Sequence, residues 1–182
     1  MPKISIKNLP IADYPEYILL DTSMLLCLHP KYSNNFQKQI KKFLTQVHNL
    51  SMSETIVAFA PTIVFEECYF KIIQMYFSQL GPGSWHTRYK NNPRLISGCQ
   101  QEITDFYNAL MEIPVIPITI NTLQNNRGDI DLENPMRKNI FSYSILPKDA
   151  LIIAITDCLE IDNIATMDLD YLRTNHLNVY TV

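Results

Sequence analysis

Short apolar runs alternate along this chain with longer stretches in which apolar residues recur at helical spacing. The runs have the length of strands and lie at 17–20, 56–60, 115–120, 164–166 and 177–182. Between them, helical patterns lie at 36–47, 63–80, 103–110 and 150–159. Strands that alternate with helices predict a parallel sheet with right-handed crossovers and helices on both faces. We therefore expect an α/β fold, a three-layer α/β/α sandwich with a parallel sheet of about five strands.

The length of 182 residues suits one domain with a single core. Two segments depart from the alternating pattern. Residues 81–98 begin with Gly81-Pro82-Gly83, which favours a variable, loop-like insertion. Residues 121–145 are rich in Asn and Asp and have little periodicity, so we expect an irregular segment with one short helix.

Composition narrows the classes of function. A hydrophobic fraction of 47% with 18% charged residues is ordinary for a globular protein, which argues against a disordered chain. The net charge of −3 excludes nucleic-acid binding through overall positive charge, so any such contact must be local. The four cysteines form no metal-binding or redox pair, and no stretch resembles a signal peptide or a membrane span. We expect a cytoplasmic protein with no membrane contact.

Acidic residues follow the predicted strands. Asp21 ends the first strand, Glu66 and Glu67 lie early in the helix after the second, Asp149 begins a later helix, and Asp168 follows the next strand. Parallel strands end at one edge of a sheet, so these carboxylates are expected to converge there. No Lys or Arg matches them nearby in sequence, and their repulsion would be relieved by a hard divalent cation. Oxygen ligands indicate Mg²⁺ or Mn²⁺, and such ions support phosphodiester hydrolysis.

Three segments, YILLDTSMLL, APTIVFEECYFK and LPKDALIIAITDCLEIDNIATMDLDYL, resemble the successive motifs of PIN-domain ribonucleases, including toxins of the VapC type. The resemblance runs from Tyr17 to Val182, with the middle of the chain unmatched. It implies a metal-dependent endoribonuclease. Its metal-binding and catalytic acids would be Asp21, Glu67, Asp149 and Asp168.

The resemblance also distinguishes the residues around these acids. It places the second acid six residues after Pro61 and before a small apolar residue, which selects Glu67 ahead of Cys68, with Glu66 as the alternative. Asp170 would be an outer member of the site. Hydroxyl support would come from Thr22, Ser23 and Thr166.

Other interpretations of these acids remain. Singly, Asp21 and Asp149 could cap helices and Asp168 could occupy a turn; only their joint position points to a metal site. A haloacid-dehalogenase-type phosphatase would need a second Asp where this chain has Ser23, and a receiver domain would need an acid pair and a late Lys. A non-enzymatic PIN-like scaffold that binds RNA or protein is the main alternative.

The segment from Trp85 to Arg94 alternates aromatic and basic residues, as single-stranded nucleic-acid binders do. An ordinary polar loop would have a similar composition. The candidates for RNA contact there are Trp85, Arg88, Tyr89, Lys90 and Arg94, and further candidates are Arg127, Arg137, Lys138 and Lys148. The aromatic residues Tyr69, Phe70, Tyr76 and Phe77 recur at helical spacing and are expected in the core.

The expected partner is RNA. If the protein is a toxin, an antitoxin protein would be a second partner, and we also expect a homodimer. The sequence leaves open whether the role is that of a toxin or of an RNA-processing enzyme.

Overall fold

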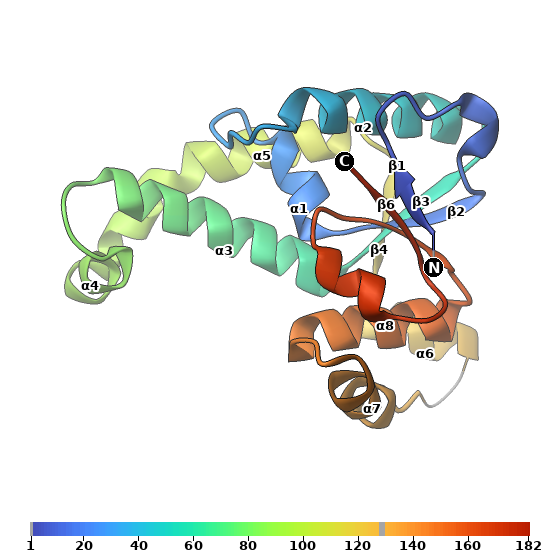
Figure 1. The fold of residues 1–182 in the computed structure, drawn as a ribbon. Coiled ribbons are helices and arrows are strands. Elements are labelled where there is room, and N and C mark those ends of the chain that lie inside the picture. Colours follow the sequence, from blue (N-terminus) through green and yellow to red (C-terminus); the bar gives the residue numbers. More distant parts are fainter. Residues whose placement is uncertain (1, 128–129) are drawn as a thin grey trace.

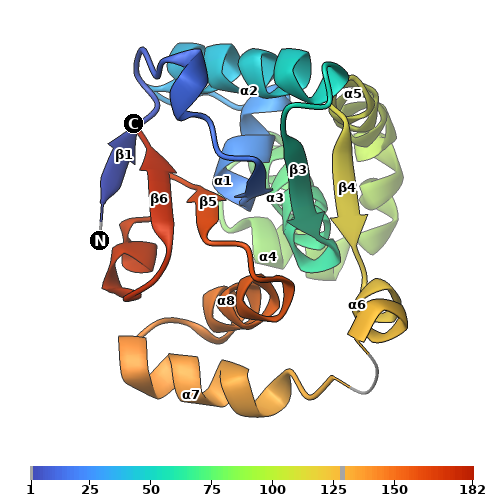
Figure 2. The same cartoon turned by 90° about the vertical axis from the view of Figure 1, so that its right-hand side faces the viewer.

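A parallel sheet forms the centre of the computed structural model, which describes residues 2–127 and 130–182 and gives only the backbone at 120 and 125–127. Within that part of the chain the sheet has six strands, in the order β1-β6-β5-β2-β3-β4. They are β1 (Lys3–Ser5), β2 (Tyr17–Leu20), β3 (Val57–Pro61), β4 (Val115–Ile118), β5 (Asn163–Ala165) and β6 (Asn178–Thr181). Helices lie on both faces (Figure 2), which confirms the three-layer α/β/α sandwich.

The centre of the sheet is β2, whose Ile18, Leu19 and Leu20 are fully buried. Leu19 aligns with Phe59 of β3 on one side and with Ile164 of β5 on the other. A parallel strand covered on both faces reads as a continuous apolar run, because neither side chain direction meets water. This is why Tyr17–Leu20 was recognisable as a strand although it does not alternate.

The helices α2, α7 and α8 cover the two faces of the sheet. The helix α2 (Gln37–Met52) covers one face, α8 (Pro147–Leu159) covers the other, and α7 (Glu133–Tyr143) packs outside α8 (Figure 2). Because α8 lies between the sheet and α7, it is apolar nearly all round, as the sequence indicated. In the described ranges, no helix combines the length and apolarity needed to cross a membrane.

The structure differs from the sequence-based expectation in two places. The strand β1 was not predicted, since three residues with exposed Lys3 and Ser5 carry no pattern; only pairing with β6 defines it. The segment expected to be irregular contains α6 (Ile120–Arg127) and α7. The charged residues Glu133, Arg137 and Lys138 of α7 are exposed, and the half-buried Met136, Ile140 and Tyr143 pack on the core. The polar Asn139 is buried and donates to the Ala150 carbonyl of α8 (3.4 Å).

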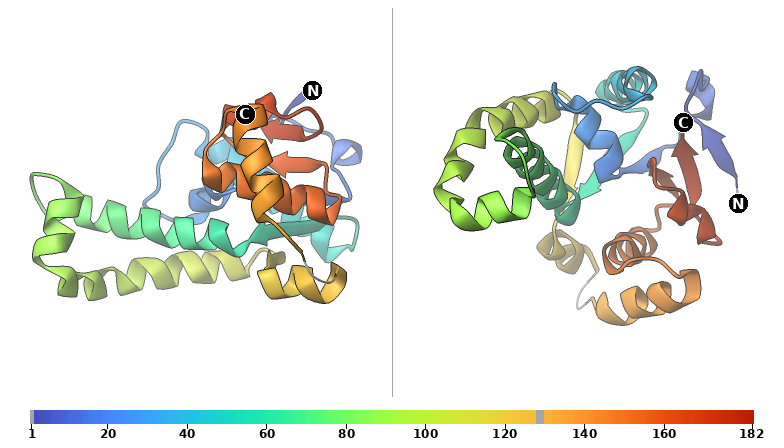
Figure 3. Two further views of the ribbon diagram at one scale, coloured as in Figure 1. Left: turned by 90° about the horizontal axis from the view of Figure 1, so that it is seen from below. Right: turned by 60° about the vertical axis from the view of Figure 1, so that its left-hand side comes forward.

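A helical arm projects from the sheet (Figures 1 and 3). It consists of α3 (Thr62–Gln79) and the returning α5 (Gln100–Met111), with α4 (Trp85–Asn91) at the tip where we expected a loop. Near the sheet α3 contacts α1 and β3, and along the arm it packs on α4, α5 and the 3-10 segment Pro93–Cys99. As a result, Phe77 is buried as predicted, whereas Phe70 is 47% exposed and is not a core residue.

Candidate active site

The acids gather where the strand order reverses. After β2, the chain continues through β3 and β4 towards one edge and then returns to β5 on the other side of β2. Ligand sites of open parallel sheets lie at the carboxyl ends of the strands at such a switch point. Asp21 directly follows β2, and its backbone N–H donates to the Ala165 carbonyl at the end of β5 (3.0 Å). The ends of both strands are thereby fixed side by side.

Two hydroxyl groups hold the Asp21 carboxylate. Ser23 Oγ donates to Asp21 Oδ2 (2.9 Å), and Thr166 Oγ1 donates to the same oxygen (2.8 Å). Each hydroxyl is in turn fixed by the loop after β5, because Met167 N donates to Ser23 Oγ and Asp168 N donates to Thr166 Oγ1, both at 2.9 Å. Of the three hydroxyls expected to support the site, Ser23 and Thr166 contact Asp21, whereas Thr22 Oγ1 is buried and has no hydrogen-bond partner among the described residues.

The second carboxylate oxygen of Asp21, Oδ1, takes no part in this hydrogen-bond network. Asp21 is 4% exposed, and its buried Oδ1 has no hydrogen-bond partner among the described residues. The helix-cap role is real but uses Oδ2, which accepts from Ser23 N (3.4 Å) at the start of α1 (Thr22–Leu25). A buried carboxylate oxygen without a partner is costly, and a cation would compensate it.

Asp149 lies in the first turn of α8 and is 7% exposed. Its Oδ1 accepts a hydrogen bond from the buried Tyr171 hydroxyl (3.2 Å). Burial raises the pKa of Asp149 to about 6; the positive charge of Lys148 opposes this, and the negative charges of Asp21 and Asp168 add to it. Asp21 and Asp168 thus both lie close enough to Asp149 for their charges to act on it.

A lysine lies among these acids. The Lys148 ammonium forms an ion pair with Glu67 Oε2 and lies 4.0 Å from Asp149 Oδ1. Burial alone would raise the pKa of Glu67, but the hydrogen bond and the positive charge of Lys148 lower it. Burial would likewise lower the pKa of Lys148, but Glu67 and the neighbouring carboxylates raise it. The expectation of an acid cluster without a matching cation was therefore wrong, because Lys148 supplies one.

The remaining acids take outer positions. Glu66 is exposed, so of the two neighbouring glutamates it is Glu67 that faces the other acids through Lys148. Asp168 is exposed, and its Oδ1 accepts from Asp170 N (2.8 Å). Asp170 pairs with Arg173 (2.9 Å), and its place as an outer member of the site stays a prediction.

The donors fit a hard cation that keeps much of its water. Within the described ranges, no group of three or more His, Cys, Asp or Glu side chains is placed so that together they could hold a metal ion. Mg²⁺, however, usually retains several waters and takes only one or two carboxylates directly. Asp21 Oδ1 is a buried oxygen without a partner, and Asp149 and Asp168 lie near it. Asp21 could therefore bind Mg²⁺ or Mn²⁺ directly, and Asp149 and Asp168 could bind it through its retained waters.

Sequence reasoning missed two members of this site. Lys148 was considered only as an RNA contact, although its position directly before Asp149 in the same helical turn could have indicated it. Tyr171 was not considered at all, although it lies three residues after Asp168 in the 3-10 helix Leu169–Arg173. Its full burial with a hydroxyl directed at Asp149 follows only from tertiary packing.

The segment Trp85–Arg94, with its alternating aromatic and basic residues, forms much of the arm tip, and one of its basic residues makes hydrogen bonds within the arm. The Arg88 guanidinium donates to the carbonyls of Phe77, Gly81 and Gly83, and so ties the end of α3 to the start of α4. Arg88 is thus engaged within the arm, and its expected contact with phosphate stays a prediction. Lys90 and Arg94 are exposed.

The aromatic residues of the tip line a groove of about 300 Å³. The Trp85 ring stacks on His86 at a centroid distance of 3.9 Å and contacts Phe70 edge-on. The groove is lined by Phe70, Ile73, Trp85, His86, Tyr89, Lys90 and Ile96. It presents aromatic faces beside a lysine.

The other basic candidates lie near α7. Arg137 donates to Asn134 Oδ1 (2.8 Å), and Lys138 is exposed. The side chain of Arg127 lies outside the described residues.

Comparison with known proteins bears on the fold. No family model matches the chain, and no curated protein matches it. Among solved structures, a similar one is the crystal structure of VapBC2 from Rickettsia felis bound to a DNA fragment from their promoter. The match covers 91% of this chain and 98% of that chain, with a TM-score of 0.51 and 11% identity. At this identity the likeness shows a shared fold, the three-layer sandwich described above.

Proposed function

We propose that this protein is a divalent-metal-dependent endoribonuclease with a PIN-like fold. The observation that carries the proposal is the buried, unpartnered Oδ1 of Asp21 at the switch point of the sheet, with Asp149 and Asp168 beside it. The resemblance of the flanking motifs to PIN-domain ribonucleases and the fold shared with VapBC2 support it.

In this proposal, Asp21, Asp149 and Asp168 hold the ion, and the hydroxyls of Ser23 and Thr166 orient Asp21. A bound divalent ion would supply a water of lowered pKa and neutralise charge at the phosphate. Hydrolysis adds water across one P–O ester bond, leaving a phosphate on one RNA end and a hydroxyl on the other. The fixed position of Asp21 at the junction of β2 and β5 sets the geometry for that step.

Titration of Mn²⁺ into the metal-free full chain by calorimetry tests the proposal. Replacement of Asp21 by Asn should weaken Mn²⁺ binding at least tenfold, because an outer partner alone can change metal affinity by about that factor. Glu66→Gln is the matched control, since it removes one exposed carboxylate beside the site. Equal affinity of wild type and Asp21→Asn would contradict the metal assignment.

A non-cleaving scaffold is the second candidate, and one observation favours it. The ion pair between Lys148 and Glu67 neutralises one acid without any metal. Incubation of the protein with single-stranded RNA and Mn²⁺ separates the two functions. Cleavage by wild type that is lost in Asp21→Asn supports the enzyme, while RNA binding without cleavage supports the scaffold.

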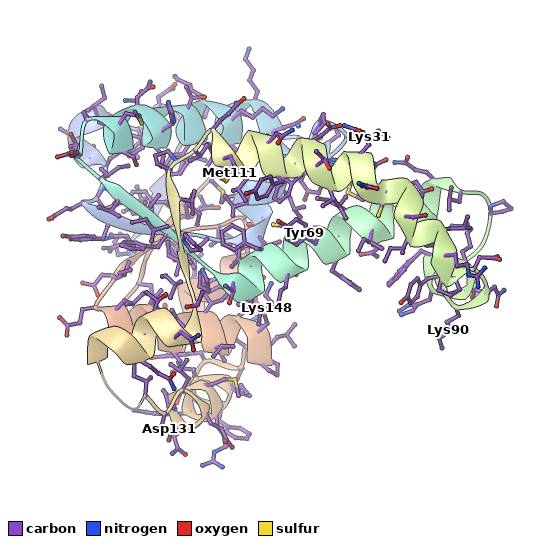
Figure 4. The ribbon with its side chains drawn as sticks, turned by 180° about the vertical axis from the view of Figure 1, so that it is seen from behind. Lys31, Tyr69, Lys90, Met111, Asp131 and Lys148 are labelled. Carbon is purple, nitrogen blue, oxygen red and sulfur yellow. The ribbon has the colours of Figure 1, made fainter. Side chains whose placement is uncertain are left out.

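We propose that RNA approaches along the arm. Residues 68–101 contain four basic residues and no acidic one, in a chain with net charge −3. The aromatic groove at the tip, with Lys90 beside it, suits base stacking and phosphate contact. The helix α3 carries Glu67 near its start and runs on to the tip, so it connects the tip to the acids. Lys148 and Lys90 mark the two ends in Figure 4.

A protein partner is also part of the proposal. The structural neighbour VapBC2 was solved as a complex with promoter DNA. By analogy we propose an antitoxin partner for this chain, together with a homodimer. Co-expression with the product of an adjacent gene, followed by light scattering, tests both. A chain that stays monomeric and binds no such product would leave an RNA-processing role.

A further inference from the structure

The position of Lys148 divides the acid cluster into two unequal halves. Lys148 is the second residue of α8, its side chain is 29% exposed, and its ammonium lies between α3 and α8 (Figure 4). On one side it pairs with Glu67. On the other side it lies 4.0 Å from Asp149 Oδ1, at the limit of an ion pair. The cation is therefore committed mainly to Glu67.

On the Asp21 side the charge of Lys148 acts only from a distance, because its contact there is the 4.0 Å approach to Asp149, and Asp21 itself has no ion pair among the described residues. Asp21 Oδ1 is buried without a hydrogen-bond partner in the described part of the chain, and two further aspartates lie close by. A divalent ion attracted to the cluster would gain most on this side, because the charge of Glu67 is already matched. A second ion on the Glu67 side would have to displace the ammonium.

We propose that Lys148 is a positioning residue that limits this site to one divalent ion. Its ammonium takes the place that a second ion would occupy beside Glu67, and it presents a fixed positive charge to the phosphate of a bound RNA. This inference rests on the proposed metal-dependent function. It makes Glu67 a partner of Lys148 and not a ligand of the ion.

The number of Mn²⁺ ions bound per chain tests the proposal without any activity measurement. Calorimetry or electron paramagnetic resonance of the full chain should give one ion for wild type. Lys148→Gln frees Glu67 and should raise the number to two, and the double variant Lys148→Gln/Glu67→Gln should return it to one. Lys138→Gln removes an exposed lysine of α7 and is the control for net charge; it should stay at one.

A third variant keeps the inference testable if Lys148→Gln fails to fold. Glu67→Gln removes the ion-pair acceptor, and it should bind one ion with an affinity within about threefold of wild type. A loss of tenfold or more would show that Glu67 is a ligand and would overturn the inference.

The remaining outcomes separate the inference from the proposed function. Two ions in wild type, or one ion in well-folded Lys148→Gln, would overturn the role of Lys148 and leave the nuclease proposal standing. No Mn²⁺ binding by wild type would overturn the proposed function and this inference with it.

Discussion

The carboxyl edge of the sheet carries buried acidic side chains, whereas the outer half of the arm carries exposed basic side chains. At the edge, Asp21 and Asp149 are 4% and 7% exposed, and hydroxyl groups hold them in place. On the arm, Lys90 and Arg94 are exposed. Burying a carboxylate opposes folding, whereas an exposed lysine costs little. The buried carboxylates thus destabilise the metal-free fold, a cost that binding of a cation would offset. The exposed basic residues of the arm are accessible to a negatively charged partner.

Cleavage is expected to show the largest effect of this difference. If the edge performs the chemistry, Asp21→Asn should lower the RNA cleavage rate by more than about a hundredfold, since metal stabilisation contributes several kcal/mol. Lys90→Ala, on the arm, should leave the rate at saturating RNA near that of wild type. Single-turnover cleavage of a labelled oligonucleotide measures both. Equal losses in the two variants would remove the distinction between the regions.

Asp149 should make the metal-free fold less stable at neutral pH. Its pKa in the fold is about 6, against an ordinary value near 4, so the unfolded chain loses this proton at lower pH than the folded chain does. The stability that protonated Asp149 provides is complete below about pH 4 and is lost as the pH rises to about 6. Two pKa units correspond to about 3 kcal/mol.

Asp149→Asn should therefore melt higher than wild type in EDTA, by roughly 5–10 °C at pH 7 and by little at pH 4. Thermal unfolding across that pH range measures the difference. Mn²⁺ should narrow it, because the ion stabilises wild type. A lower melting temperature at pH 7 would indicate that Asp149 acts mainly as a helix cap.

Replacement of Thr166 tests whether the orientation of Asp21 affects Mn²⁺ binding. Its buried hydroxyl donates to Asp21 Oδ2 and accepts from Asp168 N, so it connects two of the proposed ligands. Thr166→Val should weaken Mn²⁺ binding by about 10- to 100-fold, as loss of an orienting partner does. Thr166→Ser keeps the hydroxyl and should restore most of the affinity. Failure of Ser to rescue would mean that the methyl packing is what matters.

Substitutions in the arm should have the smallest effects. Arg88 should affect stability, and Lys90 should affect RNA binding. Arg88→Ala should lower stability by about 1–2 kcal/mol, because three carbonyls lose their donor. Lys90→Ala should change stability by less than about 0.5 kcal/mol but should reduce the salt slope of single-stranded RNA binding by roughly 0.7. Denaturation and titrations at several salt concentrations measure these values. An unchanged slope in Lys90→Ala would move the RNA contact away from the tip.

The sequence by itself determined the sandwich and the meeting point of the acids. Strand and helix periods follow from backbone geometry, and parallel strands must end at a common edge, so Asp21 and Asp168 could be placed before any contact was known. The sequence also predicted α8 as a helix buried on several sides, because Ala150–Leu159 is apolar nearly all round.

Only the tertiary structure decided which charges pair. Lys148 meets Glu67 across 81 positions of sequence, and Arg88 turns back onto the end of α3 when its spacing alone suggested an RNA contact. The edge strand β1 likewise exists through pairing with β6 and not through its own pattern. Local periodicity cannot predict such features, because a side-chain ion pair or an edge strand depends on which elements lie side by side, and that is set by packing of the whole chain.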